Sequence, residues 1–546
     1  MRNRFERLER EFDVVVIGGG INGAGVARDA ARRGFRVVLL EKNDFGSGSS
    51  SRTSKLAHGG LRYLEQGALR LVWEACHERQ TLLRLAPHLV RPLPFVFPVY
   101  EDSRLDALRL RIGMWLYDVL ATFRNVRRHH MLRLASDNRW SRGLRTDGLR
   151  AAALYYDAIM DDARLVVANV ISAREAGART MNGAAVRGLL VHEGSLRGVE
   201  VVDGLTGDTC ELRARCAVSC TGAWTNALLA RLPGVPRAVE PTRGTHLLVR
   251  PITQQAFTLS ADRDGRIFFV LPWLGLTLIG TTDVEHGDDP DQVAPSDDEV
   301  EYLLAEANHF FPGARLQRRD VIAAFAGLRP LLRADGHESS RSREHRILQP
   351  VPRLLSVVGG KYTTYRAVAE EVVDRIEALL GRRGRCSTAA DPLPGGHLRW
   401  SPREHWEEGE ALRNAAAEGA RVSGLSLEVV SRLYRTHGSR APQILALAKE
   451  DATLAAPLCA HQPHTRAEVR FAVREDMALH LEDWFLRRSR MGYRACHGID
   501  ALDSVADLFA AELGWSGDQR AREIDSCHER LDELALNRPP ASSRSS

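Results

Sequence analysis

Three glycines and one acidic residue near the start of the chain have the types and spacing of a dinucleotide-binding motif. Gly18, Gly20 and Gly23 form a G-x-G-x-x-G pattern, and Glu41 follows about 20 residues later. The first glycine makes a tight turn, the second lets a pyrophosphate approach the backbone, and the third lets a helix pack closely on a strand. The acid accepts hydrogen bonds from a ribose diol. The pattern predicts dinucleotide binding; the alternative is a glycine-rich turn in another α/β protein.

The elements around the motif appear in the order that such binding needs. Residues 12–17 (FDVVVI) are β-branched and apolar, which indicates a buried parallel strand. Residues 24–33 predict a helix that Gly34 ends, and residues 35–40 predict a second strand that runs into Glu41. The N-terminus of the helix then faces the phosphates of the ligand.

A polar loop follows this unit. Residues 46–54 (GSGSSSRTS) lead into residues 55–64, where an ordinary NAD-binding domain would continue with another helix and strand. The alternative is a flexible serine linker. Because the loop lies between a strand–helix–strand unit and a Gly-Gly-Leu-Arg-Tyr turn, we expect it to be ordered along an extended ligand.

The amino-acid composition limits the classes of protein to which the chain can belong. The 546 residues are 44% hydrophobic and 27% charged, with a net charge of +5, which is typical of a soluble protein of several domains. The longest apolar run, residues 268–282, is short and contains Pro272, so we expect no transmembrane helix. The charged N-terminus predicts no secretion signal. None of the eight cysteines is in a C-x-x-C pair, so we expect reduced thiols and no metal site.

Four motifs together resemble one family. GGGINGAG (18–25), SKLAHGGLRYLE (54–65), GTTD (280–283) and GGKYTTYR (359–366) are similar to motifs of the FAD-dependent, quinone-linked glycerol-3-phosphate dehydrogenases. The resemblance runs from about residue 12 to about residue 366 and continues more loosely beyond. It implies FAD as cofactor, glycerol 3-phosphate as substrate, dihydroxyacetone phosphate as product and a membrane quinone as electron acceptor.

The expected fold is α/β (α+β), with an FAD-binding Rossmann-like domain, an antiparallel-sheet substrate domain and a C-terminal helical domain. The oxidoreductase region is expected over residues 12–390, with FAD-binding parts at about 12–92, 150–235 and 324–390. Its substrate-domain parts are expected at about 93–149 and 236–323. The proline- and glycine-rich residues 391–396 predict a linker, residues 397–536 the helical domain, and residues 537–546 a disordered tail. An apolar stripe predicts a helix over residues 155–169.

The resemblance also implies site residues. The cofactor-binding set is Gly18, Gly19, Gly20, Ile21, Asn22, Gly23, Glu41, Lys42, Ser49, Ser50, Ser54, Lys55, Leu56, His58, Gly222, Gly360, Thr363 and Thr364. The substrate-binding set is Arg62, Tyr63, His246, Arg329 and Lys361, of which His246, Arg329 and Lys361 are the catalytic candidates. Lys361 gains weight because only four of the 75 basic residues are lysines. Arginine can hold two phosphate oxygens in one plane, whereas lysine acts as a point charge.

Two roles stay open. His246 is one candidate for the base that takes the hydroxyl proton. Alternatively, Arg329 stabilises the developing alkoxide while water takes the proton. Asp283 either orients one of these groups or caps a turn.

Two other functions are alternatives to a quinone-linked dehydrogenase. A glycerol-3-phosphate oxidase, which uses oxygen, would share the domain plan. A flavin-dependent nucleic-acid-modifying or binding protein fits the pI of 8.8 but lacks a basic run interleaved with aromatic residues, so we expect no nucleic-acid partner. A homodimer is compatible with the sequence.

The implied quinone predicts a cytoplasmic protein bound peripherally to the anionic inner face of the cell membrane. One segment has apolar residues at helical spacing, interleaved with arginines. The apolar residues are Leu105, Leu108, Ile112, Trp115, Leu116, Val119, Leu120 and Phe123, and the arginines are Arg104, Arg109, Arg111, Arg124, Arg127 and Arg128. The alternative is an ordinary amphipathic helix packed on the core.

Overall fold

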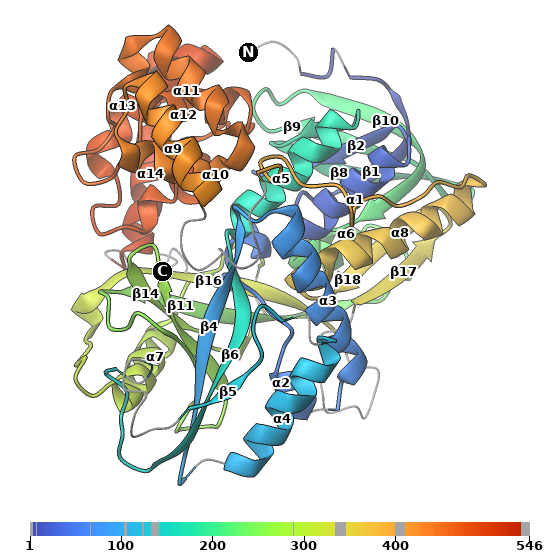
Figure 1. Ribbon diagram of the computed structural model, residues 1–546. Helices are drawn as coiled ribbons and strands as arrows, with labels where there is room; N and C mark the ends of the chain where they lie inside the picture. Colours follow the sequence, from blue (N-terminus) through green and yellow to red (C-terminus); the bar gives the residue numbers. More distant parts are fainter. Residues whose placement is uncertain are drawn as a thin grey trace, which may run out of the picture.

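Two sheets and a helical C-terminal region make up the computed structural model (Figure 1). It describes every residue except 1–3, 7, 66, 103–105, 123–124, 133–139, 141, 288, 334–344, 399–409 and 537–546. The expected disordered tail therefore lies outside the described residues. Among the described helices, none combines the length and the apolar character that a bilayer crossing needs.

The first sheet has eight strands and a parallel centre. Its main path is β17–β18–β10–β1–β2–β7, and β9 pairs with β10 and with β8. The pairings of β1 with β2 and β10, of β10 with β18 and of β2 with β7 are parallel. The bounds are β1 (Glu11–Ile17), β2 (Val37–Leu40), β7 (Arg179–Met181), β8 (Ala184–His192), β9 (Ser195–Asp203), β10 (Thr209–Ser219), β17 (His345–Val351) and β18 (Leu354–Gly359).

Helices pack against this sheet because its strands are apolar on both faces. Val14, Val15 and Val16 of β1 have no exposed surface. Helix α1 (Ile21–Arg32) contacts α5 (Asp162–Glu175) and α8 (Tyr365–Leu380), and the three helices share one hydrophobic cluster with the strands. The strand–helix–strand unit predicted from residues 12–40 is thus present.

The second sheet has ten strands and is antiparallel except where β12 runs parallel to β4. Its path is β15–β11–β14–β13–β12–β4–β6–β3, with β16 on β11 and β5 on β6. Helix α7 (Asp297–Phe310) packs on it through Val300, Leu303 and Leu304. The bounds are β3 (Leu56–Ala57), β4 (Val90–Tyr100), β5 (His130–Met131), β6 (Leu149–Met160), β11 (Val239–Val249), β12 (Ala256–Ser260), β13 (Ile267–Trp273), β14 (Leu276–Gly280), β15 (Val284–Glu285) and β16 (Val321–Leu332).

The C-terminal region is helical, as predicted, and lies beside both sheets (Figure 1). Its apolar core is continuous with that of the second sheet, since Phe325 and Trp273 belong to the same cluster as Phe485 and Phe509. The helices are α9 (Glu410–Ser423), α10 (Leu427–His437), α11 (Ala441–Glu450), α12 (Arg466–Arg474), α13 (Leu502–Leu513) and α14 (Gly517–Leu534). The fold class expected from the sequence is confirmed; the numbered domain limits stay a prediction.

The structure differs from one expected element. The helix predicted over residues 155–169 is two elements, because β6 continues to Met160 and α5 begins only at Asp162. Most of residues 155–160 are buried, so both faces of this part of the strand are covered by protein. A strand buried on both faces has no alternating pattern to distinguish it from a buried helix.

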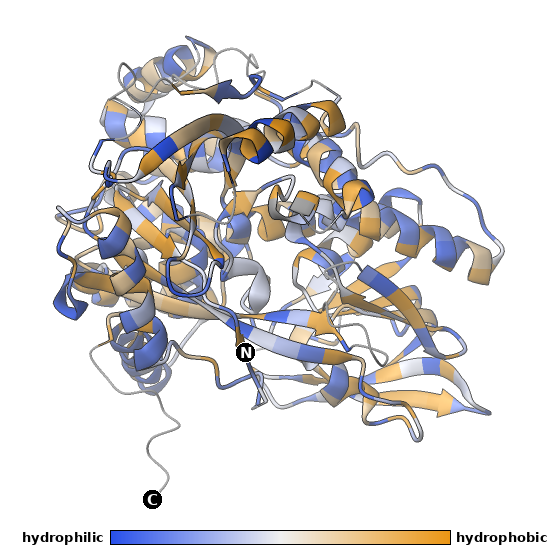
Figure 2. Cartoon of the chain, turned by 90° about the horizontal axis from the view of Figure 1, so that it is seen from below, coloured by the Kyte–Doolittle hydropathy of each residue, from blue (hydrophilic) through white to orange (hydrophobic). Residues whose placement is uncertain are grey.

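The remaining helices are α2 (Arg62–Glu65), α3 (Leu69–Leu85), α4 (Ala107–Leu120) and α6 (Thr225–Leu229). Helix α4 covers the middle of the predicted arginine-rich segment, and it is apolar on two sides. Arg104, Leu105, Phe123 and Arg124 lie outside the described residues, and Arg127 and Arg128 follow the helix. Leu110, Met114 and Tyr117 are buried, whereas Leu108, Ile112 and Trp115 are 66%, 59% and 59% exposed. Hydrophobic and hydrophilic residues alternate along many of the helices (Figure 2), but on α4 the solvent side also carries large apolar side chains.

Candidate functional site

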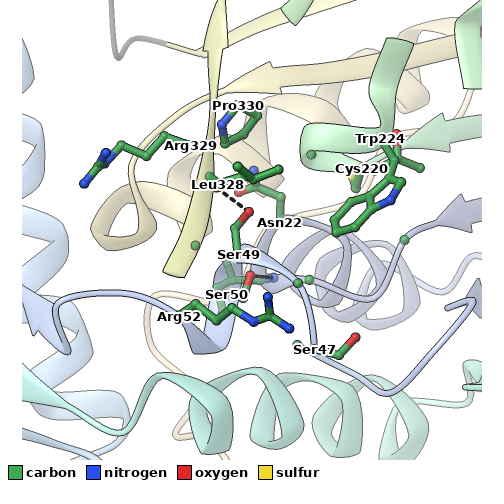
Figure 3. Close-up of a pocket in the computed structure, with 18 of the residues that line it drawn as sticks. Asn22, Ser47, Ser49, Ser50, Arg52, Cys220, Trp224, Leu328, Arg329 and Pro330 are labelled. Carbon is green, nitrogen blue, oxygen red and sulfur yellow. Dashed lines mark hydrogen bonds between the residues drawn. The ribbon is translucent and has the colours of Figure 1, made fainter. Parts of the chain in front are cut away.

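A cavity of about 590 Å³ lies between the two sheets (Figure 3). On one side it meets the carboxyl ends of β1, β2, β10 and β18, through Ile17, Leu40, Cys220 and Gly359. On the other side it meets β11 and β16 of the second sheet. A crevice outside the carboxyl ends of parallel strands is where α/β proteins bind their ligands.

The glycines of the G-x-G-x-x-G motif are required by close backbone contacts. Gly18 has a φ of +99°, and a Cβ there would lie 2.7 Å from the carbonyl oxygen of Cys220. A Cβ on Gly23 would lie 1.9 Å from the Gly18 oxygen, so the helix could not pack on the strand. Gly20 precedes α1 and lines the cavity. This is the arrangement that a pyrophosphate needs.

Glu41 lies at the end of β2, and two backbone amides hold its carboxylate. The N–H of Gly19 donates to Oε2 at 2.6 Å, and the N–H of Asn43 donates to Oε1 at 2.9 Å. Burial raises the pKa of Glu41 despite these bonds. The carboxylate therefore has a fixed orientation on the cavity wall, where a ribose diol can donate to it.

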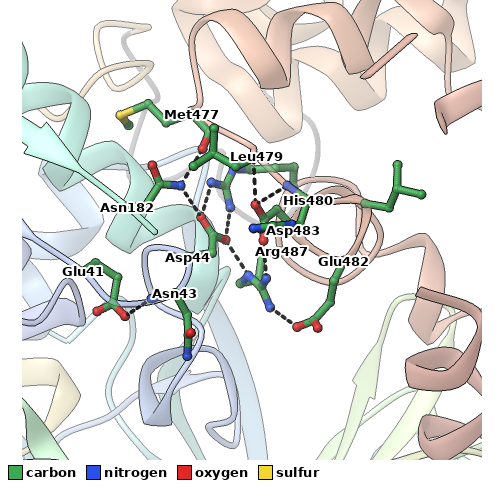
Figure 4. A network of polar contacts seen from close by, with 12 residues as sticks. Glu41, Asn43, Asp44, Asn182, Met477, Leu479, His480, Glu482, Asp483 and Arg487 are labelled. Atoms are coloured by element: carbon green, nitrogen blue, oxygen red, sulfur yellow. Dashed lines mark hydrogen bonds and ion pairs between the residues drawn. The ribbon is translucent and has the colours of Figure 1, made fainter. Parts of the chain in front are cut away.

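The loop after Glu41 is fastened to the C-terminal region (Figure 4). Asp44 receives two hydrogen bonds from Arg488, at 2.7 and 2.8 Å, and one from Arg487 at 2.5 Å. Asp44 and Arg488 are each 1% exposed. Burial alone would raise the pKa of Asp44, but the two guanidinium groups outweigh it and hold that pKa below its ordinary value.

The serine-rich loop is ordered, as its position in the sequence predicts. Ser49 Oγ donates to the Leu328 carbonyl of β16 at 2.5 Å, and Ser50 Oγ accepts from the N–H of Ile21 at 3.0 Å. The loop thus connects the phosphate-binding turn with the second sheet, along the length of the cavity (Figure 3).

The residues of this cavity fit FAD. Asn22 Oδ1 is buried and has no hydrogen-bond partner among the described residues, although Asn22 lines the cavity. A buried polar atom of this kind calls for a partner on a ligand. The expected cofactor residues that line the cavity are Gly18, Gly20, Ile21, Asn22, Glu41, Lys42, Ser49, Ser50, Ser54, Leu56, His58, Gly222, Gly360 and Thr363.

Four expected cofactor residues are not among the cavity-lining residues. Gly19 and Gly23 shape the turn behind it. Thr364 is buried, and its hydroxyl donates to the Lys361 carbonyl. The Lys55 ammonium is 2.9 Å from Asp162 and donates to the Ser51 carbonyl, so its charge is used inside the protein.

On the side of the cavity formed by the second sheet, His246 is on β11 opposite Gly280 of β14. A Cβ on Gly280 would lie 2.3 Å from the imidazole, so glycine makes room for the ring. The ring stacks on Phe325 with centroids 5.0 Å apart, and Nε2 is 2.8 Å from Ser54 Oγ. Burial, together with Arg329 and Lys55, holds the pKa of His246 well below its ordinary value, so the ring is neutral at physiological pH.

Arg329 of β16 is held in place by the GTTD motif. Its guanidinium is 3.0 Å from Asp283 and donates to Thr281 Oγ1 at 2.8 Å and to the Thr282 carbonyl at 3.0 Å. Of the two roles open for Asp283, orientation of a site residue is the one that this contact supports. Arg329 also lines the cavity.

Lys361 and Tyr63 meet on the opposite wall. Lys361 Nζ is 3.6 Å from the centroid of the Tyr63 ring, and both residues line the cavity. Gly60 and Gly360, at φ +78° and +97°, form the turns beside them. Arg62 lies in α2, but its side chain is outside the described residues.

Ser47, Arg52 and Thr53 line the cavity within the 46–54 loop that was predicted to lie along the ligand, although they were not named singly. Burial together with the nearby Arg530 lowers the pKa of Arg52 to about 10, so it remains a cation at neutral pH. Six basic and two acidic residues line the cavity, which favours an anionic ligand. Further wall residues that were absent from the predicted site include Arg187, Thr221, Trp224, Arg231, Gly327 and Pro330. Generic arginines and single turn residues carry no local pattern that could have identified them.

Comparisons with known proteins show the family to which the chain belongs. Residues 13–375 match the family model described as FAD dependent oxidoreductase, and residues 386–520 match the C-terminal domain of alpha-glycerophosphate oxidase. Glycerol-3-phosphate dehydrogenase of Synechocystis sp. is 36% identical over 98% of this chain and 99% of its own length. That of Mycobacterium leprae is also 36% identical, over 98% of this chain and 90% of its own length.

A solved structure extends the likeness to three dimensions. The glycerol-3-phosphate dehydrogenase from Bacillus halodurans, complexed with FAD, has a TM-score of 0.80 and 28% identity, over 98% of this chain and 97% of its own. Together with the cavity, the motif glycines and the identities above, this leads to one conclusion: the chain is an FAD flavoprotein that belongs to the glycerol-3-phosphate dehydrogenase family.

Proposed function

We propose that this dehydrogenase oxidises sn-glycerol 3-phosphate to dihydroxyacetone phosphate with the residues named above, and that the electrons leave to a membrane quinone. Bound FAD supplies the hydride acceptor. The observation that carries the residue roles is that a neutral buried histidine, His246, lines the same cavity as Arg329, Lys361 and Tyr63. An alcohol next to a phosphate dianion needs a base and cations in this arrangement.

His246 is the proposed base. It is neutral and therefore able to accept a proton, and Ser54 beside Nε2 fixes the direction of the ring. The hydroxyl proton of the substrate moves to Nε2, directly or through the Ser54 hydroxyl. A positively charged imidazole would be opposed by Arg329 and Lys55, so the proton is held only briefly. Transfer to water with Arg329 at the alkoxide is the competing route.

Arg329, Lys361 and Tyr63 are the proposed phosphate-binding groups. Asp283 and Thr281 fix the guanidinium of Arg329, which lowers the entropy lost on binding. Lys361 supplies a compact charge and Tyr63 a hydroxyl from the facing wall. Arg62 is assigned to the phosphate-binding groups only because it lies in the family motif at residues 54–65.

An anaerobic absorption spectrum tests the substrate and the base together. We expect glycerol 3-phosphate to bleach the oxidised flavin band, and glycerol or lactate to leave it. His246→Gln should retain FAD but slow the bleaching by about 10²–10⁴-fold, the usual contribution of a general base. His192→Gln, on an exposed strand end, is the matched control. Bleaching at the wild-type rate in His246→Gln would favour water as the proton acceptor.

The membrane contact is proposed at α4 and the start of α3, which contact each other. Leu69 and Trp73 of α3 are 44% and 48% exposed, and they add to the exposed Leu108, Ile112 and Trp115 of α4. Arg109 and Arg111 lie on the same helix. Exposed apolar residues among arginines suit the headgroup region of an anionic bilayer, where a quinone is reached.

Co-sedimentation with anionic vesicles at low and high salt tests this surface. Trp73→Ser with Trp115→Ser should reduce binding, whereas Val422→Ser, which removes an exposed apolar residue of α9, should not. Vesicle binding that survives the double substitution would move the contact elsewhere. Rapid hydrogen peroxide release without added quinone, and no vesicle binding at any salt concentration, would identify an oxidase instead.

A further inference from the structure

Two cysteines and an aspartate meet in the C-terminal region, away from the FAD cavity. Cys459 lies in the loop between η6 (Ala452–Ala455) and α12, which a β-bridge between Pro457 and Thr465 closes. Cys496 lies between η8 (Met491–Tyr493) and η9 (Ile499–Ala501), and Asp500 is in η9. Their sulfur and carboxylate atoms all lie within 4.8 Å of one another. Two separate loops therefore bring three metal-ligating side chains together.

The distance between the two sulfur atoms is informative. They are 3.9 Å apart. Two thiolates on one tetrahedral zinc ion, each about 2.3 Å from it, are separated by about 3.8 Å. A disulfide requires about 2.05 Å. The observed separation suits a shared metal ion as well as a weak S–H···S contact between two thiols, and a disulfide would require the two loops to approach each other.

Backbone and side-chain N–H groups surround the sulfur atoms. The N–H of His461 donates to Cys459 Sγ at 3.3 Å, and Gln462 Nε2 donates to Cys496 Sγ at 3.0 Å. The N–H of Ala460 donates to Asp500 Oδ2 at 3.0 Å. Such donors stabilise thiolates and fix ligand orientation in metal sites. The loop between Cys459 and Gln462 thus holds all three ligands in position.

The cluster is open on one side. Cys459 is buried, Cys496 is half-buried and Asp500 is exposed, so an ion can enter past the carboxylate. His461 is exposed, lies two residues after Cys459 and interacts electrostatically with Asp500. The His461 imidazole is not among the atoms that lie within 4.8 Å of one another, so a water molecule would take the fourth position of a tetrahedral site.

We propose that Cys459, Cys496 and Asp500 bind one zinc ion, or another thiophilic divalent ion of tetrahedral preference, as a structural site. This goes beyond the proposed oxidation chemistry, in which the ion has no part. It would connect the loop before α12 with the loop that follows Tyr493. The Tyr493 ring packs edge-on against Phe325, with centroids 5.7 Å apart, and Phe325 stacks on His246. The ion would thus stabilise a segment that supports His246 through Phe325.

The test uses the reduced, full-length holoenzyme. Cobalt(II), added to metal-free protein, should give a thiolate-to-metal charge-transfer band and tetrahedral ligand-field bands that saturate at one equivalent. Zinc should displace the cobalt and raise the melting temperature. Cys459→Ser with Cys496→Ser should lose both effects. Cys386→Ser should keep both the charge-transfer band and the rise in melting temperature, because this half-buried thiol is hydrogen-bonded to Thr388 elsewhere in the chain.

A second variant keeps the proposal testable if the double substitution does not fold. Asp500→Asn retains both thiols, and its cobalt affinity should fall at least tenfold while the charge-transfer band persists. The proposal is overturned if reduced wild-type protein gives no charge-transfer band, or if Cys386→Ser abolishes the band. It is also overturned if the isolated protein carries a Cys459–Cys496 disulfide and, after reduction, binds no metal.

Discussion

Replacing Asp44 by asparagine should detach the loop that follows Glu41 from the C-terminal region. In the wild type, one carboxylate is paired with the guanidinium groups of both Arg487 and Arg488, which are 5% and 1% exposed. Asparagine has the same shape, so the change removes charge without opening a cavity. Two buried cations would then remain without their main counter-charge, although Asp483 and Glu482 still contact Arg487.

The expected cost is large for one substitution. Removal of one partner of a buried ion pair typically costs about 3–5 kcal/mol. Because the loop carries Glu41 three residues earlier, FAD should also dissociate at a lower urea concentration than in the wild type. The measurements are the urea midpoint from tryptophan fluorescence and the flavin fluorescence that accompanies FAD release.

A surface pair provides the matched control. Glu418 and Arg421 are 60% and 72% exposed on α9, so Glu418→Gln removes a carboxylate from a solvated pair. Its urea midpoint should equal that of the wild type, because water replaces the lost partner. If Asp44→Asn and Glu418→Gln have the same midpoint and the same FAD release, the buried network does not hold the two regions together.

Three further predictions concern the site and the pH dependence. Arg329→Ala and Lys361→Ala should each weaken glycerol 3-phosphate binding by about 1.5–3 kcal/mol, seen as a raised KM with FAD content unchanged; an unchanged KM in both would remove them from the phosphate site. Gly20→Val should yield protein without flavin after purification, whereas stoichiometric FAD would place the phosphate loop elsewhere. Burial lowers the pKa of His480, but a hydrogen bond to Glu523 and the charges of Asp483, Glu523 and Asp44 together outweigh it and raise that pKa to about 9, above about 6.5 in the unfolded chain. Its stabilisation should be complete below about pH 6.5 and lost as the pH rises through 9, and His480→Gln should flatten that part of the melting-temperature profile.

Local patterns predicted the FAD-binding part of the fold well. The G-x-G-x-x-G turn, the flanking strands and Glu41 are consecutive in the sequence, and each has a geometric role that its residue type reveals. The polar loop was also predicted to be ordered, because its position between two motifs left little room for a linker. The bonds from Gly19 to Glu41 and from Ile21 to Ser50 span 22 and 29 residues, so local sequence contains them, whereas the bond from Ser49 to Leu328 spans 279 residues and no local pattern indicates it.

Features that depend on contacts between distant residues were harder to predict from the sequence. Lys55 was expected at the cofactor because it lies in a family motif, but its partner Asp162 is 107 residues away and draws the ammonium inward. The apolar stripe of α4 did not reveal that Leu108, Ile112 and Trp115 face solvent, because the helix is apolar on two sides. Cys459 and Cys496 are 37 residues apart, so no C-x-x-C spacing marks them.

One short segment of the C-terminal region contacts both sheets beside the FAD cavity. Arg487 and Arg488 hold Asp44, three residues after Glu41, and Tyr493 packs on Phe325, whose ring stacks on His246. Arg487, Arg488 and Tyr493 are all buried, and a few residues of chain separate them. Because the segment contacts both the loop after β2 and strand β16, we expect it to fix the second sheet relative to the FAD-binding sheet. Substitutions in this segment should therefore change FAD affinity and substrate oxidation together, although its residues need not contact the cofactor or the substrate.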